Sequence, residues 1–173
     1  MELNLEEALD APVELSQRLD VPVERLERPE LVSLSPVTFQ GVLRHLEPGF
    51  VLSGRLGFEG QAICARCLGP VPFTREADVS WVFSPAYRRS EGEEVELKAD
   101  DLDVVYYEDY TVPFDPLVEE QLQLEIPLKP LCRPDCKGLC PRCGADRNAV
   151  ACGCAPEGDA RLEALRALLP KTS

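Results

Sequence analysis

The chain has 173 residues, of which 45% are hydrophobic, so its composition excludes a disordered protein and allows one domain with a core plus a small appendage. A formal charge of −13 disfavours non-specific binding of the whole surface to a phosphate backbone. The acidic N-terminus has no basic segment followed by an apolar run, and no stretch reaches membrane-spanning length. We therefore expect a cytoplasmic protein with no membrane partner.

The first 30 residues are rich in leucine, glutamate and proline and predict short elements packed on a main sheet. Asn4 is a favourable N-cap residue, so a short helix is expected to extend from it through Leu9. Pro12, Pro22 and Pro29 divide the remainder into short pieces, which leaves room for an edge strand.

Residues 36–83 carry the clearest structural signal, a hydrophobic alternation of period two in three successive runs. Such alternation is typical of strands with one buried and one solvated face. Two tight turns, the second at Cys64–Cys67, join the runs and predict an antiparallel meander. Gly54, Gly57 and Gly60 are expected to mark bends or bulges where the sheet curls. The residues predicted to face the core are Val37, Phe39, Leu43, Phe50, Leu52, Leu56, Phe58, Ala62, Val71, Phe73, Ala77, Val79, Trp81 and Phe83.

The region after the meander predicts an exposed acidic loop over 84–103, a strand over Val104–Tyr107 and a helix. Asp115 is expected to cap this helix, with Pro116 in its first turn, and Pro127 limits its length. Its apolar stripe is expected to consist of Leu117, Gln121, Leu124 and Leu128.

A last helix is predicted within residues 156–173, capped by Asp159 and ended by Pro170, with a leucine-rich face that packs on the sheet or on a partner. The expected fold class is α+β: a curled antiparallel β-meander forming a partial barrel, with a few short helices and a C-terminal cysteine-rich module like a zinc ribbon. The expected division is a β-rich domain over 1–127, a metal module over 128–155 packed on it, and the C-terminal helix.

Six of the eight cysteines lie between residues 132 and 154, and the other two form a C-x-x-C pair upstream. A thiolate is a strong ligand for soft metal ions, and Zn²⁺ takes four at tetrahedral corners. Because the chain bears no secretory signal, we favour metal over disulfides or buried free thiols. A redox C-x-x-C usually opens a helix, whereas a strand follows this one, so a thiol oxidoreductase is less favoured.

Eight cysteines divide evenly into two Cys₄ zinc sites, with iron as the less favoured metal. The compact C-terminal run can close on itself, which leaves the upstream pair to combine with the first two cysteines of the cluster. The main alternative exchanges Cys136 with members of the distal set. The two expected ligand sets are Cys64, Cys67, Cys132 and Cys136, and Cys140, Cys143, Cys152 and Cys154.

The cysteine-rich stretch also holds a local group of basic residues in an otherwise acidic chain. Five basic and two acidic residues lie between residues 128 and 154, a local charge of +3 that leaves −16 on the remainder. Ordinary solvated charge around a metal module is the alternative interpretation. The candidate RNA or partner contacts are Lys129, Arg133, Lys137, Arg142 and Arg147.

Two blocks of residues resemble the YceD-like family, also called large ribosomal RNA subunit accumulation proteins. Ile63–Leu68, at the end of a long strand, resembles the family's central signature, and residues 126–144, Ile-Pro-Leu-Lys-Pro-Leu-Cys through Cys-Pro-Arg-Cys-Gly, resemble its C-terminal block. The resemblance spans residues 1–155 and implies a role in accumulation of large-subunit (23S) ribosomal RNA. Many relatives lack the distal cysteines, so the last four would form a lineage-specific second site.

The resemblance and the cysteines together favour a non-enzymatic factor in ribosome assembly with structural zinc and no small-molecule substrate. All-cysteine coordination leaves neither an open metal position nor an adjacent base, which disfavours an enzyme. The expected partner is a precursor of the large ribosomal subunit or an assembly protein. The alternative is a zinc-stabilised adaptor between proteins outside ribosome biogenesis.

Overall fold

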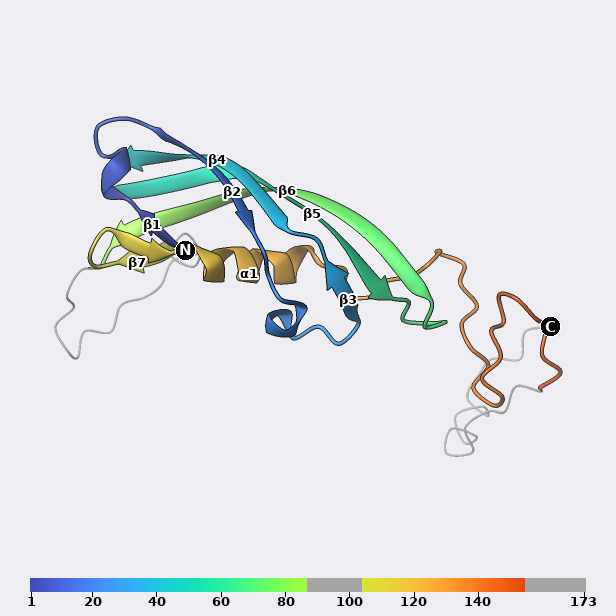
Figure 1. The fold of residues 1–173 in the computed structure, drawn as a ribbon. Helices are drawn as coiled ribbons and strands as arrows, with labels where there is room; N and C mark the ends of the chain where they lie inside the picture. Colours follow the sequence, from blue (N-terminus) through green and yellow to red (C-terminus); the bar gives the residue numbers. More distant parts are fainter. Residues whose placement is uncertain (87–103, 155–173) are drawn as a thin grey trace, which may run out of the picture.

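The computed structural model describes residues 1–86 and 104–154, in which an open β-sheet curves over one α-helix (Figure 1). The main sheet has the order β2-β4-β5-β6-β7, and β3 pairs with the far part of β5. A separate two-stranded sheet pairs β1 with β8. The strands are β1 (Glu2–Asn4), β2 (Val13–Leu19), β3 (Leu31–Leu34), β4 (Val37–Leu46), β5 (Gly49–Ile63), β6 (Pro70–Pro85), β7 (Val104–Tyr107) and β8 (Thr111–Pro113), and the helices are the 3₁₀ helices η1 (Glu6–Ala8) and η2 (Val23–Leu26) and the α-helix α1 (Phe114–Glu125).

The predicted antiparallel meander is confirmed as β4, β5 and β6, which pair in sequence. The predicted inward residues of β4 and β5 are all buried, as are Val79 and Phe83 on β6. The rings of Phe39, Trp81 and Phe114 pack together, with Phe39 and Trp81 centroids 5.7 Å apart. The part of β6 nearer the hairpin tip is only half-buried, because α1 lies under the other half of the sheet (Figure 1).

The glycines of β5, expected to mark bends or bulges, mark no bulge against β4 or β6. The pairing of β5 with β6 runs without a register shift from Phe50 to Ile63. Two of the glycines leave room for close neighbours: a Cβ on Gly54 would lie 2.4 Å from the Gln40 carbonyl oxygen and 2.8 Å from the Phe39 ring, and one on Gly60 would lie 2.6 Å from the Phe73 ring. The β3–β5 pairing does have a register shift, between Leu31 and Ser33 of β3, next to the pairing of Leu34 with Gly60.

The predicted strand over Val104–Tyr107 forms as β7, but it pairs with β6 in parallel. The sequence analysis gave no pairing direction for this strand, so its parallel alignment adds to the predicted meander. A parallel partner requires a long connection, and residues 86–103 supply one. In the described residues the sheet has β2 and β7 at its edges and is not closed. The strand β6 also includes Ser84 and Pro85, which the sequence assigns to the acidic loop.

Helix α1 turns a different face to the core from the one predicted. Phe114, Leu117, Val118 and Leu122 are buried, whereas Leu124 and Leu128 are 77% and 79% exposed. The packing of Phe114 against the aromatic core sets this rotation, and the buried spacing is that of a regular amphipathic helix.

The C-terminal end of α1 was predicted correctly from Pro127, whereas the predicted N-terminal cap at Asp115 was wrong. The helix begins at Phe114, after Pro113, with no side-chain cap, so Asp115 does not cap it. The Asp115 carboxylate instead accepts a hydrogen bond from the Met1 amino group at 2.8 Å. The helix ends at Glu125, before the Ile126–Pro127 step, as predicted.

The N-terminal elements agree in outline with the sequence. The Asn4 side chain accepts a hydrogen bond from the Glu6 backbone N–H at 3.0 Å, where a 3₁₀ helix replaces the longer helix expected. Strand β2 is the expected edge strand, paired only with β4 among the described strands. The helix predicted within 156–173 and residues 87–103 lie outside the described residues. Within the described residues, no helix has the length and apolar character needed to cross a membrane.

Candidate metal centres

The first candidate centre starts at the tip of the β5–β6 hairpin. The Leu68 N–H donates to the Cys64 carbonyl at 3.0 Å, and the Cys64 N–H donates to the Gly69 carbonyl at 2.8 Å. These bonds fold the C-x-x-C segment into a tight turn that directs Cys64 inward, where its side chain is buried, and leaves Cys67 half-buried. Leu68 takes a left-handed backbone conformation, with φ of 60°, to close the turn.

The segment that follows α1 returns to this tip and brings two more cysteines to it. The Ala65 N–H donates to the Pro130 carbonyl at 2.9 Å, and the Leu139 N–H donates to the Arg66 carbonyl at 3.0 Å. The Arg66 guanidinium donates to the carbonyl of Cys136 at 2.7 Å. The hairpin tip and the C-terminal segment are thus joined by backbone hydrogen bonds on both sides of the cysteines.

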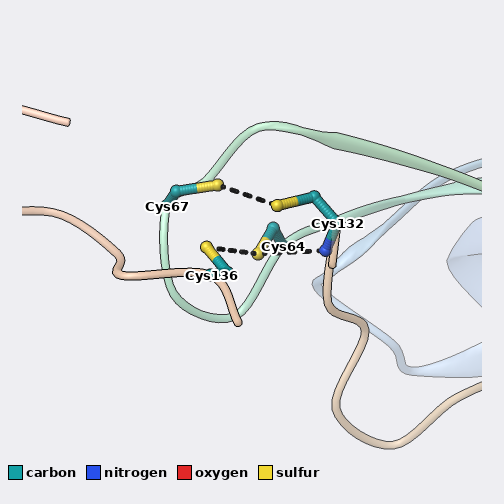
Figure 2. A group of neighbouring side chains, drawn as sticks. All are labelled: Cys64, Cys67, Cys132 and Cys136. Carbon is teal, nitrogen blue, oxygen red and sulfur yellow. Dashed lines mark hydrogen bonds between the residues drawn. The ribbon is translucent and has the colours of Figure 1, made fainter. Parts of the chain in front are cut away.

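The four sulfur atoms that meet at the tip form what we call the proximal cluster: Cys64, Cys67, Cys132 and Cys136 (Figure 2). All four lie within 4.8 Å of one another, with Sγ–Sγ distances of 3.9 Å for Cys64 and Cys136 and 3.6 Å for Cys67 and Cys132. A tetrahedral zinc site with Zn–S bonds of about 2.3 Å has sulfur–sulfur edges of roughly 3.8 Å. The spacing of the proximal cluster therefore fits a tetrahedral thiolate site.

The distal cluster consists of the remaining cysteines, Cys140, Cys143, Cys152 and Cys154, whose sulfur atoms also lie within 4.8 Å of one another. Its C-x-x-C turn repeats the one at the hairpin tip. The Gly144 N–H donates to the Cys140 carbonyl at 2.9 Å, and Gly144 has φ of 71°, where Leu68 has 60°. The Cys140 N–H donates to the Ala145 carbonyl at 2.8 Å, and Leu139 forms a β-bridge with Asp146.

The structure thus brings the eight cysteines together in the two sets of four that the sequence analysis expects, without exchange of Cys136. None of the eight is in a disulfide. Two sets of four cysteine sulfurs at these spacings could each hold a metal ion, and the all-sulfur donor set is compatible with zinc.

The backbone around the clusters favours the thiolate form at one cysteine of each. Burial raises the pKa of Cys64, but hydrogen bonds from the backbone N–H groups of Cys67, Cys132 and Arg66 outweigh it and lower that pKa to about 6. In the distal cluster, the N–H groups of Cys143 and Arg142 lower the pKa of Cys140 to about 6. A metal-free cluster can therefore hold at least one thiolate near neutral pH, which favours metal capture.

Other cysteines in each cluster retain their protons. A hydrogen bond shared with Cys136 raises the pKa of Cys132 to about 12, and one shared with Cys143 raises that of Cys154 to about 12. Cys136 differs from these two: burial raises its pKa, but hydrogen bonds from the Asn148 side chain and the Gly138 backbone outweigh burial, and its pKa is lowered. Metal binding would accordingly release the remaining protons.

The five basic residues named from the sequence lie in the segment that carries six of the eight cysteines, and all five are exposed. Arg133 lies 3.6 Å from the Asp135 carboxylate, an exposed pair that contributes little to stability. Lys137 and Arg147 take part in the module through their backbone N–H groups, which leaves their side chains at the surface.

Two residues with roles at the proximal cluster are absent from the sequence prediction, Arg66 and Asn148. Arg66 lies inside the C-x-x-C turn. Its place between the two cysteines could have indicated that its guanidinium binds the segment that carries the partner cysteines. The Asn148 side chain donates to the Cys136 sulfur at 3.3 Å from the far end of the module. No local pattern identifies such a residue, because its role depends on a tertiary contact.

These features define a class: β-rich proteins in which an open sheet presents a cysteine turn at a hairpin tip and a C-terminal segment completes the four-cysteine centre. The family model described as large ribosomal RNA subunit accumulation protein YceD matches residues 52–169, which include both clusters. The chain belongs to the YceD family, and the resemblance noted in the sequence is confirmed.

Curated relatives support the same assignment over part of the chain. Uncharacterized proteins of Mycobacterium bovis and Mycobacterium tuberculosis are each 34% identical to it over 96 residues, which cover 56% of this chain and 44% of the relative. A Zea mays protein named large ribosomal RNA subunit accumulation protein YCED homolog 1, chloroplastic, is 40% identical over 50 residues, 28% of this chain and 17% of its own length. The chain thus spans less than half the length of these relatives. No solved structure matches it.

Proposed function

We propose that this protein is a non-enzymatic factor in the accumulation of 23S ribosomal RNA, acting during assembly of the large ribosomal subunit in the cytoplasm. Membership of the YceD family supports the proposed pathway, since the family's description names accumulation of large-subunit RNA and no reaction. The observation that carries the structural role is the proximal cluster, in which the hairpin tip supplies two cysteines and the C-terminal segment supplies two.

The two clusters are proposed as Cys₄ zinc sites. Zinc in such sites supplies structural cross-links, because four thiolates fill its coordination shell. Cys64 and Cys67 would hold the end of the sheet to Cys132 and Cys136, and the distal cluster would close the zinc-ribbon-like module on itself. Elemental analysis of the purified full chain should find two zinc ions per molecule. A finding of one metal ion per chain would contradict one of the two sites, and a finding of iron would contradict the assignment of zinc.

The module is proposed to comprise residues 128–155, packed on a β-rich domain of residues 1–127, with a C-terminal helix within 156–173. The hydrogen bonds from Ala65 to Pro130 and from Leu139 to Arg66 support the packing of the module on the hairpin tip. A partial-barrel curl of the sheet remains part of this proposal.

The module is also the proposed contact surface for RNA. The part of the chain that follows α1 runs to one end of the molecule (Figure 1). Five exposed basic residues belong to it in a chain of net charge −13: Lys129, Arg133, Lys137, Arg142 and Arg147. Five charges support a handful of phosphate contacts, and the acidic remainder would limit indiscriminate binding to RNA.

A charge-reversal variant tests this surface: Arg133→Glu, Lys137→Glu and Arg142→Glu together. The matched control reverses three exposed arginines of the sheet, Arg18, Arg44 and Arg55, to glutamate. Both variants should fold and retain two metal ions. Only the module variant should fail to restore 23S RNA levels in cells that lack the protein. Equal restoration by both would remove the basic surface from the mechanism.

A crosslinking map in the native complex then identifies the direct partner. Crosslinks from the module to precursor RNA support the proposal. Crosslinks from the module to an acidic assembly protein would transfer the contact to that protein. Absence of the protein from ribosomal precursors on sedimentation would favour an adaptor outside ribosome biogenesis.

A further inference from the structure

Asn148 joins the two clusters although it belongs to neither. Its side-chain amide donates one hydrogen bond to the Cys136 sulfur at 3.3 Å and another to the Asp146 carboxylate at 2.7 Å. Its carbonyl oxygen accepts a hydrogen bond from the Lys137 backbone N–H at 2.8 Å. Every polar atom of the side chain is therefore engaged, and the engaged groups fix its orientation toward the proximal cluster.

The loop that carries Asn148, residues 144–151, is bounded by ligands of the distal cluster, with Cys143 before it and Cys152 after it. Within it, the Asp146 carboxylate accepts from the Asn148 backbone N–H at 2.9 Å, and the Asp146 carbonyl accepts from Val150 at 3.0 Å. The Arg147 N–H donates to the Gly138 carbonyl at 3.0 Å. The geometry of the loop is thus determined by the distal cluster and by the short segment between the clusters.

We infer that the two clusters bind their metal ions cooperatively and that Asn148 is the positioning residue that couples them. This inference rests on the zinc sites of the proposed function. When the distal cysteines close on a metal ion, both ends of the 144–151 loop are fixed, and the amide of Asn148 is held on the Cys136 sulfur. A hydrogen bond to a metal-bound thiolate stabilises its charge, and loss of such an outer contact typically weakens metal binding about 10- to 100-fold.

Coupling of this kind is reciprocal, so each metal ion should strengthen binding of the other by the same factor. Three full-length proteins measure it with Co²⁺ as the probe, by chelator competition with native mass spectrometry to count ions. They are the unmodified chain, Cys154→Ser, which disables the distal cluster, and Cys67→Ser, which disables the proximal cluster but leaves Cys136 in place. The product of the two dissociation constants of the unmodified chain should be about tenfold smaller than the product of the two single-site constants.

Substitution of Asn148 identifies the coupling residue. Asn148→Ala, introduced into the same three proteins, should make the two products equal. Asn148→Asp retains an acceptor for the Lys137 N–H but removes the N–H donor to sulfur, and it should have the same effect. Arg147→Ala is the matched control, because Arg147 contacts Gly138 through its backbone N–H, and it should leave the coupling unchanged.

A spectroscopic signature separates this role from general support of the loop. In the Co²⁺ form, loss of the N–H···S bond should move the sulfur-to-cobalt charge-transfer band of the proximal site to lower energy, and Arg147→Ala should not. Equal products in the unmodified chain would overturn the inference while leaving the metal sites intact. If none of the three proteins bound Co²⁺, both the inference and the proposed zinc sites would be overturned.

Discussion

A Cβ atom on Gly138 would lie 2.9 Å from the carbonyl oxygen of Arg66, which places the backbone of the module directly against the hairpin tip. Gly138 also has φ of 71°, a conformation that L-residues adopt at a cost of about 1–2 kcal/mol. Gly138→Ala should therefore lower module stability by more than backbone strain alone. The measurement is amide hydrogen exchange at Leu139, whose N–H donates to the same Arg66 oxygen and should lose protection.

Two other glycines separate the steric effect from the conformational one. Gly144 has the same φ of 71° with nothing within 4 Å of a Cβ, so Gly144→Ala should cost only about 1–2 kcal/mol. Gly153 has no positive φ and no close neighbour, so Gly153→Ala should change stability by less than about 0.5 kcal/mol. If Gly138→Ala and Gly144→Ala were equally destabilising, the close approach to Arg66 would not contribute.

Leu68 occupies, at the hairpin tip, the backbone position that Gly144 occupies in the distal turn. Its side chain is 64% exposed, so it gives little burial in return for its φ of 60°. Leu68→Gly should raise stability by about 0.5–1 kcal/mol, because relief of roughly 1–2 kcal/mol of strain exceeds the entropic cost of glycine. Denaturant unfolding of the metal-loaded chain measures the change.

The control for Leu68→Gly is Leu46→Gly, at a leucine of β4 that is 57% exposed but has no positive φ. That substitution should lower stability by about 0.5–1 kcal/mol, since it adds only chain entropy to the unfolded state. Destabilisation by both substitutions would mean that Leu68 packs against the module in a way that outweighs its strain.

Helix α1 offers a test of which face meets the core. Leu122 is fully buried and Leu124 is exposed, although both are leucines in the last two turns. Leu122→Ala should destabilise the protein by about 2–5 kcal/mol, whereas Leu124→Ala should stay within about 0.5 kcal/mol. Thermal unfolding followed by the fluorescence of Trp81, the single tryptophan, reports the sheet and helix together, because its ring lies 5.9 Å from that of Phe114. A larger loss of stability for Leu124→Ala than for Leu122→Ala would support the apolar stripe predicted from the sequence instead.

The parts of this fold that could be predicted from sequence are those determined by local pattern. Alternation of period two identified β4, β5 and β6, because each inward residue meets the same core that its neighbours meet. Local pattern did not determine which face of α1 is buried. Its orientation depends on Phe114 packing between Phe39 and Trp81, two residues from different strands. The parallel pairing of β7 likewise depends on where a long connection returns, which local pattern does not contain.

The cysteine clusters show the same division. Spacing alone indicated that Cys140 and Cys143 would form one half-site, because the two cysteines belong to one turn. A count of the remaining ligands favoured the meeting of Cys64 with Cys136 but left open the exchange of Cys136 with the distal set, and the structure brings the two sulfurs to 3.9 Å. Asn148 could not be found in this way, since an asparagine in a loop has many uses and its contact with Cys136 exists only after the module folds.

The final prediction compares the loss of each cluster. Cys64→Ser removes a fully buried ligand that belongs to the sheet, and Cys140→Ser removes a buried ligand that belongs only to the module. A bound ion stabilises the folded state by about 4 kcal/mol when its free concentration exceeds the dissociation constant a thousandfold. Each variant should lose one ion and the stability that this ion supplies, but the part of the structure that loosens should differ between them.

Cys140→Ser should raise hydrogen exchange mainly within residues 137–154, because β5 and β6 keep their own pairing and the proximal cluster keeps its four ligands. Cys64→Ser should raise exchange in the same residues and also at the hairpin tip, where the Cys64 N–H donates to Gly69 and the Ala65 N–H donates to Pro130. A zinc chelator added to the unmodified chain should reproduce both effects, while Trp81 emission stays native because Trp81 pairs with Leu52, at the other end of the β5–β6 hairpin from the cysteine turn. If both variants kept two metal ions and unchanged exchange, the cysteine clusters would have no structural role, and the join between sheet and module would rest on backbone hydrogen bonds alone.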